Sequence, residues 1–210
     1  MGGNSISNYD LALEKAQADF LRYDIAPMVK KYGLAQDSAY TYIPFLRNDY
    51  RISRQTGQVE RLCGSTSPVP AGYNESMTIF DVLGYAKPEA TLSGEFSSVM
   101  QLKGVAKSAN PGGNMFQKHA QLFAGRCAVL KRACEELGGI PYPVGEVAYQ
   151  LPLFDFLPVL LQFWDADEEF DAELIIKWDN NALDFMHFET TFFATGHLLQ
   201  QLTGYIQAQK

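Results

Sequence analysis

Cysteine and histidine are scarce in this chain of 210 residues, which contains three of each. Three cysteines are too few for a disulfide framework, and no two of them have the Cys-x-x-Cys spacing of structural zinc and iron–sulfur sites. The histidines are His119, His187 and His197, and they form no His-Glu-x-x-His pattern. We therefore expect neither a disulfide scaffold nor a histidine metal site, and surface or capping positions for the histidines.

Long apolar runs are also absent. The longest apolar stretch, residues 151–164, is interrupted by Pro152, Asp155 and Pro158, whereas a membrane-spanning helix needs about 20 consecutive apolar residues. The first residues lack the basic and apolar regions of a signal peptide, and Ile6 stands where the myristoylation pattern requires Ser or Thr. The expectation is a cytoplasmic protein that makes no membrane contact.

Basic residues are nearly missing from the C-terminal third. Residues 140–210 hold two basic and 11 acidic side chains, whereas residues 1–139 hold 15 basic and 13 acidic ones. The net charge of the whole chain is −7, and a surface of this sign repels nucleic-acid phosphates and anionic membranes. We expect no nucleic-acid partner, while a protein partner or a small ligand stays open.

Apolar residues recur at helical spacing in three long stretches. The patterns predict a helix over residues 8–32 that is interrupted at Pro27, a continuous helix over 114–137 capped by Asn114, and a helix over 187–207. A shorter helix is predicted after a cap at Asn74.

Segments rich in β-branched and aromatic residues predict strands over 40–46, 49–54, 58–63, 146–154, 157–164 and 173–179. Residues 55–57 predict a hairpin turn, 64–73 a loop, and 91–113 an irregular segment with one short strand. Clustered hairpins with separate helices predict an α+β fold with a mainly antiparallel sheet packed by two long helices. The length favours a single domain over 1–210, with the N-terminal helix 8–32 and an α+β body over 40–207.

The last two strands allow a register to be predicted. If Trp164 faces Glu173 across an antiparallel pair, each side chain of one strand meets a defined partner on the other. One face of the pair is then wholly apolar, with Val159, Leu161 and Phe163 opposite Trp178, Ile176 and Leu174. The other face is mixed and holds Leu160, Gln162 and Trp164 together with Ile175, Lys177 and Asp179. The apolar face is expected to meet the core, and the mixed face to meet solvent or a partner.

The connection between these strands carries five carboxylates in seven residues, 165–171, which we call the acidic segment. Crowded carboxylates repel one another and can recruit a cation. Asp165, Asp167, Glu168 and Glu169 are therefore candidate metal ligands. The alternative is a solvated turn that keeps the hairpin soluble, and the calcium-loop pattern is not met.

A second group of candidates could bind a ligand. Gly94, Glu95 and Phe96 lie in the irregular segment, and Trp164 could contribute an aromatic surface to a pocket. The segment 110–114 could hold an anion at a helix N-terminus or serve only as a cap. The motifs GxSxG, GxGxxG and the P-loop are absent, so neither enzymatic activity nor a cofactor is assigned.

Three stretches together resemble a known family. They are Phe45–Ile52 with its turn at Gly57, Asp81–Ala86 leading to Leu92–Phe96, and Leu157–Phe170 leading to Trp178 and Asp179. They are similar to domain-of-unknown-function family 3786, which occurs mainly in anaerobic bacteria and archaea. The resemblance implies an intracellular protein of an anaerobe, linked to redox or corrinoid metabolism, but it supplies no reaction. The cysteine-rich iron–sulfur modules of some members are absent from this sequence.

Two functions follow as hypotheses. The first is a non-enzymatic binding or accessory domain that uses the mixed sheet face or the Gly94 loop. The second is a metal-dependent enzyme that uses the acidic segment, with Glu95 as general base. An oligomerisation domain is a third possibility.

Overall fold

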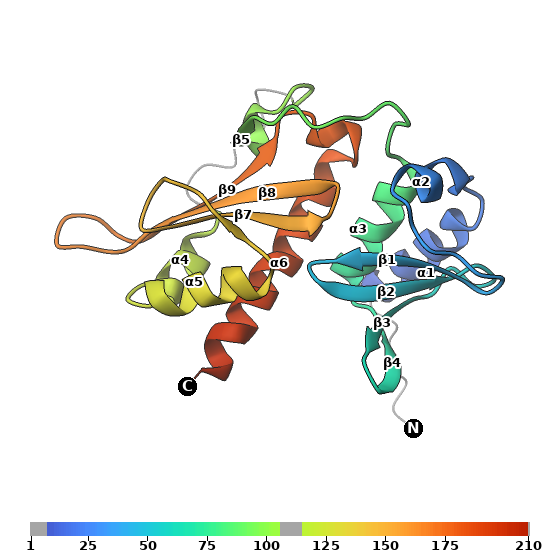
Figure 1. Cartoon of the computed structure of the whole chain (residues 1–210), viewed down its shortest axis with the longest axis horizontal. Helices are drawn as coiled ribbons and strands as arrows, with labels where there is room; N and C mark the ends of the chain where they lie inside the picture. The colour runs from blue at the N-terminus through green and yellow to red at the C-terminus, as the bar shows by residue number, and fades with distance from the viewer. Residues whose placement is uncertain (1–7, 106–114, 210) are drawn as a thin grey trace.

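The computed structural model of the protein describes residues 8–105 and 115–209. Two antiparallel sheets lie on opposite sides of one long helix, α6 (Figure 1). The first sheet has the order β1-β2-β3-β4, formed by Tyr40–Phe45, Asn48–Ser53, Val59–Cys63 and Thr66–Pro70. The second has the order β5-β9-β8-β7-β6, formed by Phe96–Ser98, Glu173–Asp179, Leu157–Trp164, Val147–Phe154 and Ile140–Pro141.

Six α-helices are formed by the described residues. They are α1 (Asn8–Phe20), α2 (Ala26–Lys31), α3 (Tyr73–Gly84), α4 (Gln117–Phe123), α5 (Cys127–Glu136) and α6 (Phe188–Ala208). Helices α1 to α3 accompany the first sheet, whereas α4 contacts β9 and α5 contacts β7 of the second (Figure 1). Helix α6 packs against α3 on one side and against α4 and α5 on the other, and thereby joins the two halves.

One cluster of buried apolar residues extends through both halves. The ring of Phe45 in β1 stacks on that of Phe154 in β7, with centroids 4.7 Å apart. Next to this stack, Leu46 N donates a hydrogen bond of 2.8 Å to Leu153 O. Contacts of this kind connect the two sheets, and the single domain over residues 1–210 stays a prediction.

The α+β class with antiparallel sheets and long helices is confirmed. The predicted register is also confirmed, because Trp164 pairs with Glu173 and Val159 with Trp178. The hairpin turn at 55–57 forms with Gly57 at φ +73°, and Pro27 lies in the first turn of a restarted helix. Within the described ranges, no helix combines the length and apolar character needed to cross a membrane.

The continuous helix predicted over 114–137 is wrong. The chain forms α4 and α5 instead, separated at Gly125, whose φ of +70° cannot continue a right-handed helix. The amide of Gly125 donates a hydrogen bond of 2.8 Å to the Asp165 carboxylate. This contact with the acidic segment stabilises the interruption between α4 and α5. The cap predicted at Asn114 lies outside the described residues.

Three smaller predictions also need correction. The loop predicted over 64–73 contains the edge strand β4. Helix α3 begins at Tyr73 with Gly72 as its cap, rather than after Asn74. The mixed face of the second sheet is not open, since Leu160 and Gln162 are buried there.

Candidate functional site

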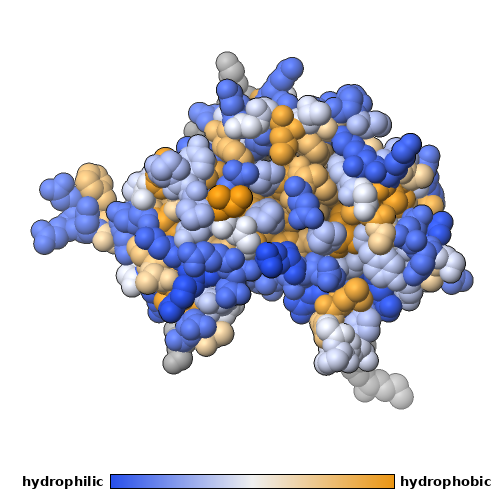
Figure 2. Space-filling view, in the orientation of Figure 1, coloured by the Kyte–Doolittle hydropathy of each residue, from blue (hydrophilic) through white to orange (hydrophobic). Residues whose placement is uncertain are grey.

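A cleft opens between the two halves of the molecule, and we call it the inter-sheet cleft. Its volume is about 460 Å³, and it is lined by Arg61, Pro70, Glu75, Ala133, Glu136, Leu137, His197, Gln200, Gln201, Gly204 and Tyr205. These residues come from β3 and β4 on one side and from α5 and α6 on the other, with α3 between them. Figure 2 shows a notch between the part that carries β4 and the part that carries α5 and α6, with hydrophilic residues gathered along it.

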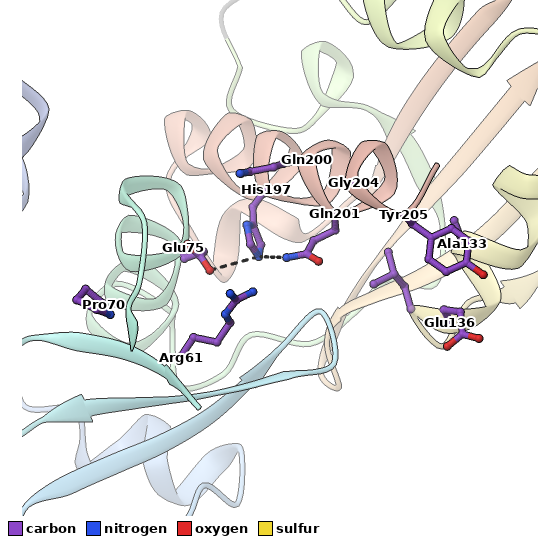
Figure 3. A pocket seen from close by; sticks show the side chains of 11 residues that line it. Arg61, Pro70, Glu75, Ala133, Glu136, His197, Gln200, Gln201, Gly204 and Tyr205 are labelled. Atoms are coloured by element: carbon purple, nitrogen blue, oxygen red, sulfur yellow. Dashed lines mark hydrogen bonds and ion pairs between the residues drawn. The ribbon is translucent and has the colours of Figure 1, made fainter. Parts of the chain in front are cut away.

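The pairing of β2 with β3 positions Arg61, which lines the cleft on the side of the first sheet. Tyr50 and Arg61 are direct partners in this ladder, and directly paired residues project from the same face of a sheet. Tyr50 is fully buried, while Arg61 is half-buried and reaches the cleft. In Figure 3 the Arg61 side chain points toward His197 and Gln201.

Helices α3 and α6 bring two further groups together. Glu75 lies in the first turn of α3, where its Oε2 accepts a hydrogen bond of 2.6 Å from Gly72 N. Gly196 lets α6 approach closely, because a Cβ there would lie 3.0 Å from the Asn74 amide nitrogen. His197 follows directly and is buried, with 3 % of its surface exposed.

A short polar network joins these side chains inside the apolar core. Tyr50 donates its hydroxyl proton to Glu75 Oε1 at 2.6 Å. His197 Nε2 lies 3.3 Å from the Tyr50 oxygen, 3.4 Å from Gln201 Nε2 and 3.8 Å from Glu75 Oε1. Three groups thus converge on one imidazole nitrogen, whereas the other, Nδ1, is buried and has no hydrogen-bond partner among the described residues.

Burial controls the protonation of the network. Desolvation lowers the pKa of His197 below its ordinary value of 6.5; the negative charge of Glu75 opposes this shift and the positive charge of Arg61 adds to it. Desolvation and the hydrogen bond to Glu75 both raise the pKa of Tyr50. At neutral pH the cleft therefore presents a neutral imidazole and a protonated phenol.

The Arg61 guanidinium is the cation of the cleft. It forms no hydrogen bond or ion pair with any residue that the structure describes. Its positive charge nevertheless acts to lower the pKa of both Tyr50 and His197. A guanidinium offers several donors in a planar fork that suits carboxylate and phosphate groups. Arg61 is thus free to bind an anion.

The buried imidazole gives the protein an acid sensitivity that can be measured. Because the folded pKa of His197 lies below 6.5, the unfolded chain binds a proton first as pH falls, and protonation favours unfolding. We expect the melting temperature to fall between about pH 7 and pH 5, and His197→Gln to reduce this fall in a pH series of thermal melts. Burial also lowers the pKa of His119. His119 should therefore account for the pH dependence of the melting temperature that remains in His197→Gln, and His119→Gln should remove it. An unchanged pH dependence in His197→Gln would contradict the assignment.

The ligand candidates of the irregular segment lie elsewhere, at the edge of the second sheet. Gly94 N donates to Asp179 Oδ2 at 2.8 Å, and Ser93 N donates to Oδ1 at 3.0 Å. Asn180 donates hydrogen bonds to Glu95, from its backbone amide to the carbonyl and from its side-chain amide to the carboxylate. Phe96 is the first residue of β5 and pairs with Asp179. These residues anchor an edge strand, and ligand binding at Gly94, Glu95 or Phe96 stays a prediction.

Trp164 and the acidic segment lie at the opposite end of β9. Glu173 and Asp179 lie six positions apart in β9, which separates the two groups by about 20 Å along the strand. Trp164, Asp165 and Asp167 line a separate hollow of about 640 Å³. The structure therefore does not bring the Gly94 loop and the acidic segment to one site.

Two of the five carboxylates of the acidic segment, Asp165 and Asp167, bind backbone amides. Partial burial acts to raise the pKa of Asp165, but hydrogen bonds from Gly125 N, Cys127 and Ala166 N hold it below its ordinary value. Asp167 accepts the amides of Glu169 and Phe170, which lower its pKa. In the part of the chain that the structure describes, no three His, Cys, Asp or Glu side chains converge to hold a metal ion. Cation binding by Asp165, Asp167, Glu168 and Glu169 stays a prediction.

The sequence interpretation missed the residues of the inter-sheet cleft. His197 was assigned a surface or capping position, but it is buried. A signal was available, since residues 190–208 contain no Asp, Glu, Lys or Arg. A helix without charges on any face is typically buried on several sides, as α6 is between the two halves.

Comparison with known proteins identifies a family. The family model described as a domain of unknown function, DUF3786, matches residues 24–201. This range includes Tyr50, Arg61, Glu75, His197 and Gln201, and ends three residues before Gly204. No curated protein and no solved structure matches the chain.

Proposed function

We propose that this chain, which belongs to the DUF3786 family of domains of unknown function, is a binding domain that holds a small polar ligand in the inter-sheet cleft. The observation that carries the proposal is the Arg61 guanidinium, which lines the cleft and forms no hydrogen bond or ion pair with a described residue. A guanidinium offers several donors in one plane, and a bound ligand would supply acceptors for them.

The size and position of the cleft support the same proposal. Its volume of about 460 Å³ lies within the usual range for small-molecule sites, roughly 300–1,000 Å³. Such sites occur preferentially where two structural units meet, and this cleft lies where the first sheet meets α5 and α6. Its polar groups project from strands and helices, which hold them more rigidly than loops would.

A glycine in the cleft provides a direct test. Gly204 lines the cleft, and a Cβ added there meets no atom within 4 Å. Gly204→Leu should therefore add a side chain in open space at the cleft and occupy part of it, and it should also favour the helix, since glycine costs about 1 kcal/mol relative to better helix formers. We expect an unchanged or higher melting temperature and at least about a tenfold loss of ligand affinity, or about 1.4 kcal/mol.

The measurement is an NMR titration with butyrate, butylamine, 4-aminobutyrate, inorganic phosphate and glycerol. Backbone amide shifts on β3, α5 and α6 in the wild type, lost in Gly204→Leu, would support the proposal. Ala208→Leu adds a similar bulk to an exposed position of α6 and should bind as the wild type does. Binding that survives Gly204→Leu, or the absence of binding by every probe, would count against the cleft.

The metal-dependent enzyme is the alternative, based on the acidic segment. Its support is the five carboxylates in seven residues, although two of them already hold backbone amides. Calorimetric titration with Mg²⁺, Mn²⁺ and Ca²⁺ tests it: heat of binding supports the alternative, and the absence of heat and of any change in melting temperature opposes it.

The remaining proposals concern the cellular context. A cytoplasmic location is supported by the three cysteines, all of which are free thiols, as expected in a reducing compartment. The link to anaerobic redox or corrinoid metabolism rests on the family resemblance, and nothing in the cleft adds to it.

A further inference from the structure

The charges around the inter-sheet cleft are arranged in two parts. Figure 3 shows Arg61 near Glu75 on one side and Glu136 near Tyr205 on the other, with Gln201 between them. Both oxygens of Glu75 already accept hydrogen bonds, from Tyr50 and from Gly72. The Glu136 carboxylate forms no hydrogen bond or ion pair with the residues described here. The groups left for a ligand are thus a cation on one side and a carboxylate on the other.

From this arrangement we propose that the ligand is an aminocarboxylate, whose carboxylate binds Arg61 and whose ammonium group faces Glu136. The inference rests on the proposed function and specifies its ligand. The planar guanidinium can bind a carboxylate through two parallel hydrogen bonds. The amide of Gln201 lies between these ends (Figure 3), and Gln200 and Tyr205 also line the cleft. These side chains offer neutral donors and acceptors.

The net charge of the cleft selects against a dianion. Arg61 contributes one positive charge, Glu75 and Glu136 contribute two negative ones, and His197 is neutral at pH 7 because burial lowers its pKa. A phosphate dianion at Arg61 would be repelled by both glutamates, whereas an aminocarboxylate brings no net charge. Selectivity therefore comes from repulsion as well as attraction.

Calorimetric titration with 4-aminobutyrate and 6-aminohexanoate, and with butyrate, butylamine and inorganic phosphate, tests the inference. The wild type should bind one of the two aminocarboxylates more tightly than butyrate, and butyrate more tightly than phosphate. Arg61→Gln should weaken binding of aminocarboxylates and butyrate at least about tenfold, or about 1.4 kcal/mol. Glu136→Gln should reduce aminocarboxylate affinity to that of butyrate and leave butyrate binding no weaker.

Two controls make the result interpretable. Arg61→Lys keeps the charge but loses the planar fork, so it should bind butyrate with intermediate affinity, and thermal melts show that each variant is folded. Tighter binding of phosphate than of any aminocarboxylate, or equal affinities in the wild type and Arg61→Gln, would overturn the inference. If those results came with binding that Gly204→Leu abolishes, the cleft would still be the binding site and only the ligand class would be wrong.

Discussion

Asp179→Ala should unfold the protein at a much lower temperature than the wild type. The Asp179 carboxylate is 1 % exposed and accepts three backbone hydrogen bonds, from Ser93, Gly94 and Asn181, at 2.8 to 3.0 Å. Each hydrogen bond to a charged group contributes about 1.5–3 kcal/mol, and a buried donor left unpaired costs a further desolvation penalty. Because such contributions are not additive, we expect a loss of about 4 kcal/mol, or roughly 8–16 °C in melting temperature for a chain of this size.

Asp184→Ala is the matched control for this prediction. Asp184 lies five residues after Asp179, its side chain is 39 % exposed, and its side chain pairs with Lys87. An exposed ion pair of this kind contributes at most about 1 kcal/mol, so its loss should change the melting temperature little. Equal shifts for the two variants would mean that Asp179 does not anchor the Ser93–Gly94 turn.

Glu75→Ala should have the second largest effect, and it acts on the cleft itself. The variant removes the acceptor of the Tyr50 hydroxyl and of the Gly72 amide. Tyr50 is fully buried, so its hydroxyl would lose its shortest partner inside the core. We expect a loss of about 3 kcal/mol, from one charge-assisted hydrogen bond to a buried donor and one lost helix cap, measured by urea unfolding.

Two further variants separate the contributions to this loss. Glu189→Ala makes the same change in the first turn of α6, where the side chain is exposed, and should cost only a small fraction as much. Tyr50→Phe combined with Glu75→Ala should cost less than the sum of the single variants, with a coupling of about 1–2 kcal/mol. Additive losses would show that the Tyr50–Glu75 hydrogen bond does not stabilise the fold.

The pairing of β8 with β9 was predictable because one face of each strand is wholly apolar. The observed register places Val159, Leu161 and Phe163 against three large apolar partners, and a slip by one residue would move every side chain to the other face. Local pattern alone was sufficient, since both strands belong to one hairpin.

The break between α4 and α5 could not be predicted in the same way. The apolar stripe continues through it, with Phe123, Leu130 and Cys134 all buried. A single glycine inside a helical pattern is usually tolerated. Here the break is held by the Asp165 carboxylate, which is 40 residues away in sequence, so a tertiary contact overrides the local preference.

The residues of the inter-sheet cleft could not be predicted from the sequence for a related reason. Tyr50 and His197 are separated by 147 residues, and Arg61 and Glu75 lie on different elements again. Single residues of these types, in no known motif, favour a surface position when considered alone. Their chemistry becomes visible only when β2, β3, α3 and α6 are placed side by side.

The central claim is that the inter-sheet cleft is the binding site of this protein. A crystal structure of the protein soaked with 6-aminohexanoate tests the claim most directly. We predict electron density between Arg61 and Glu136, with the carboxylate of the probe on the guanidinium. An empty cleft, with the probe instead in the hollow beside Trp164 and Asp167, would contradict the account.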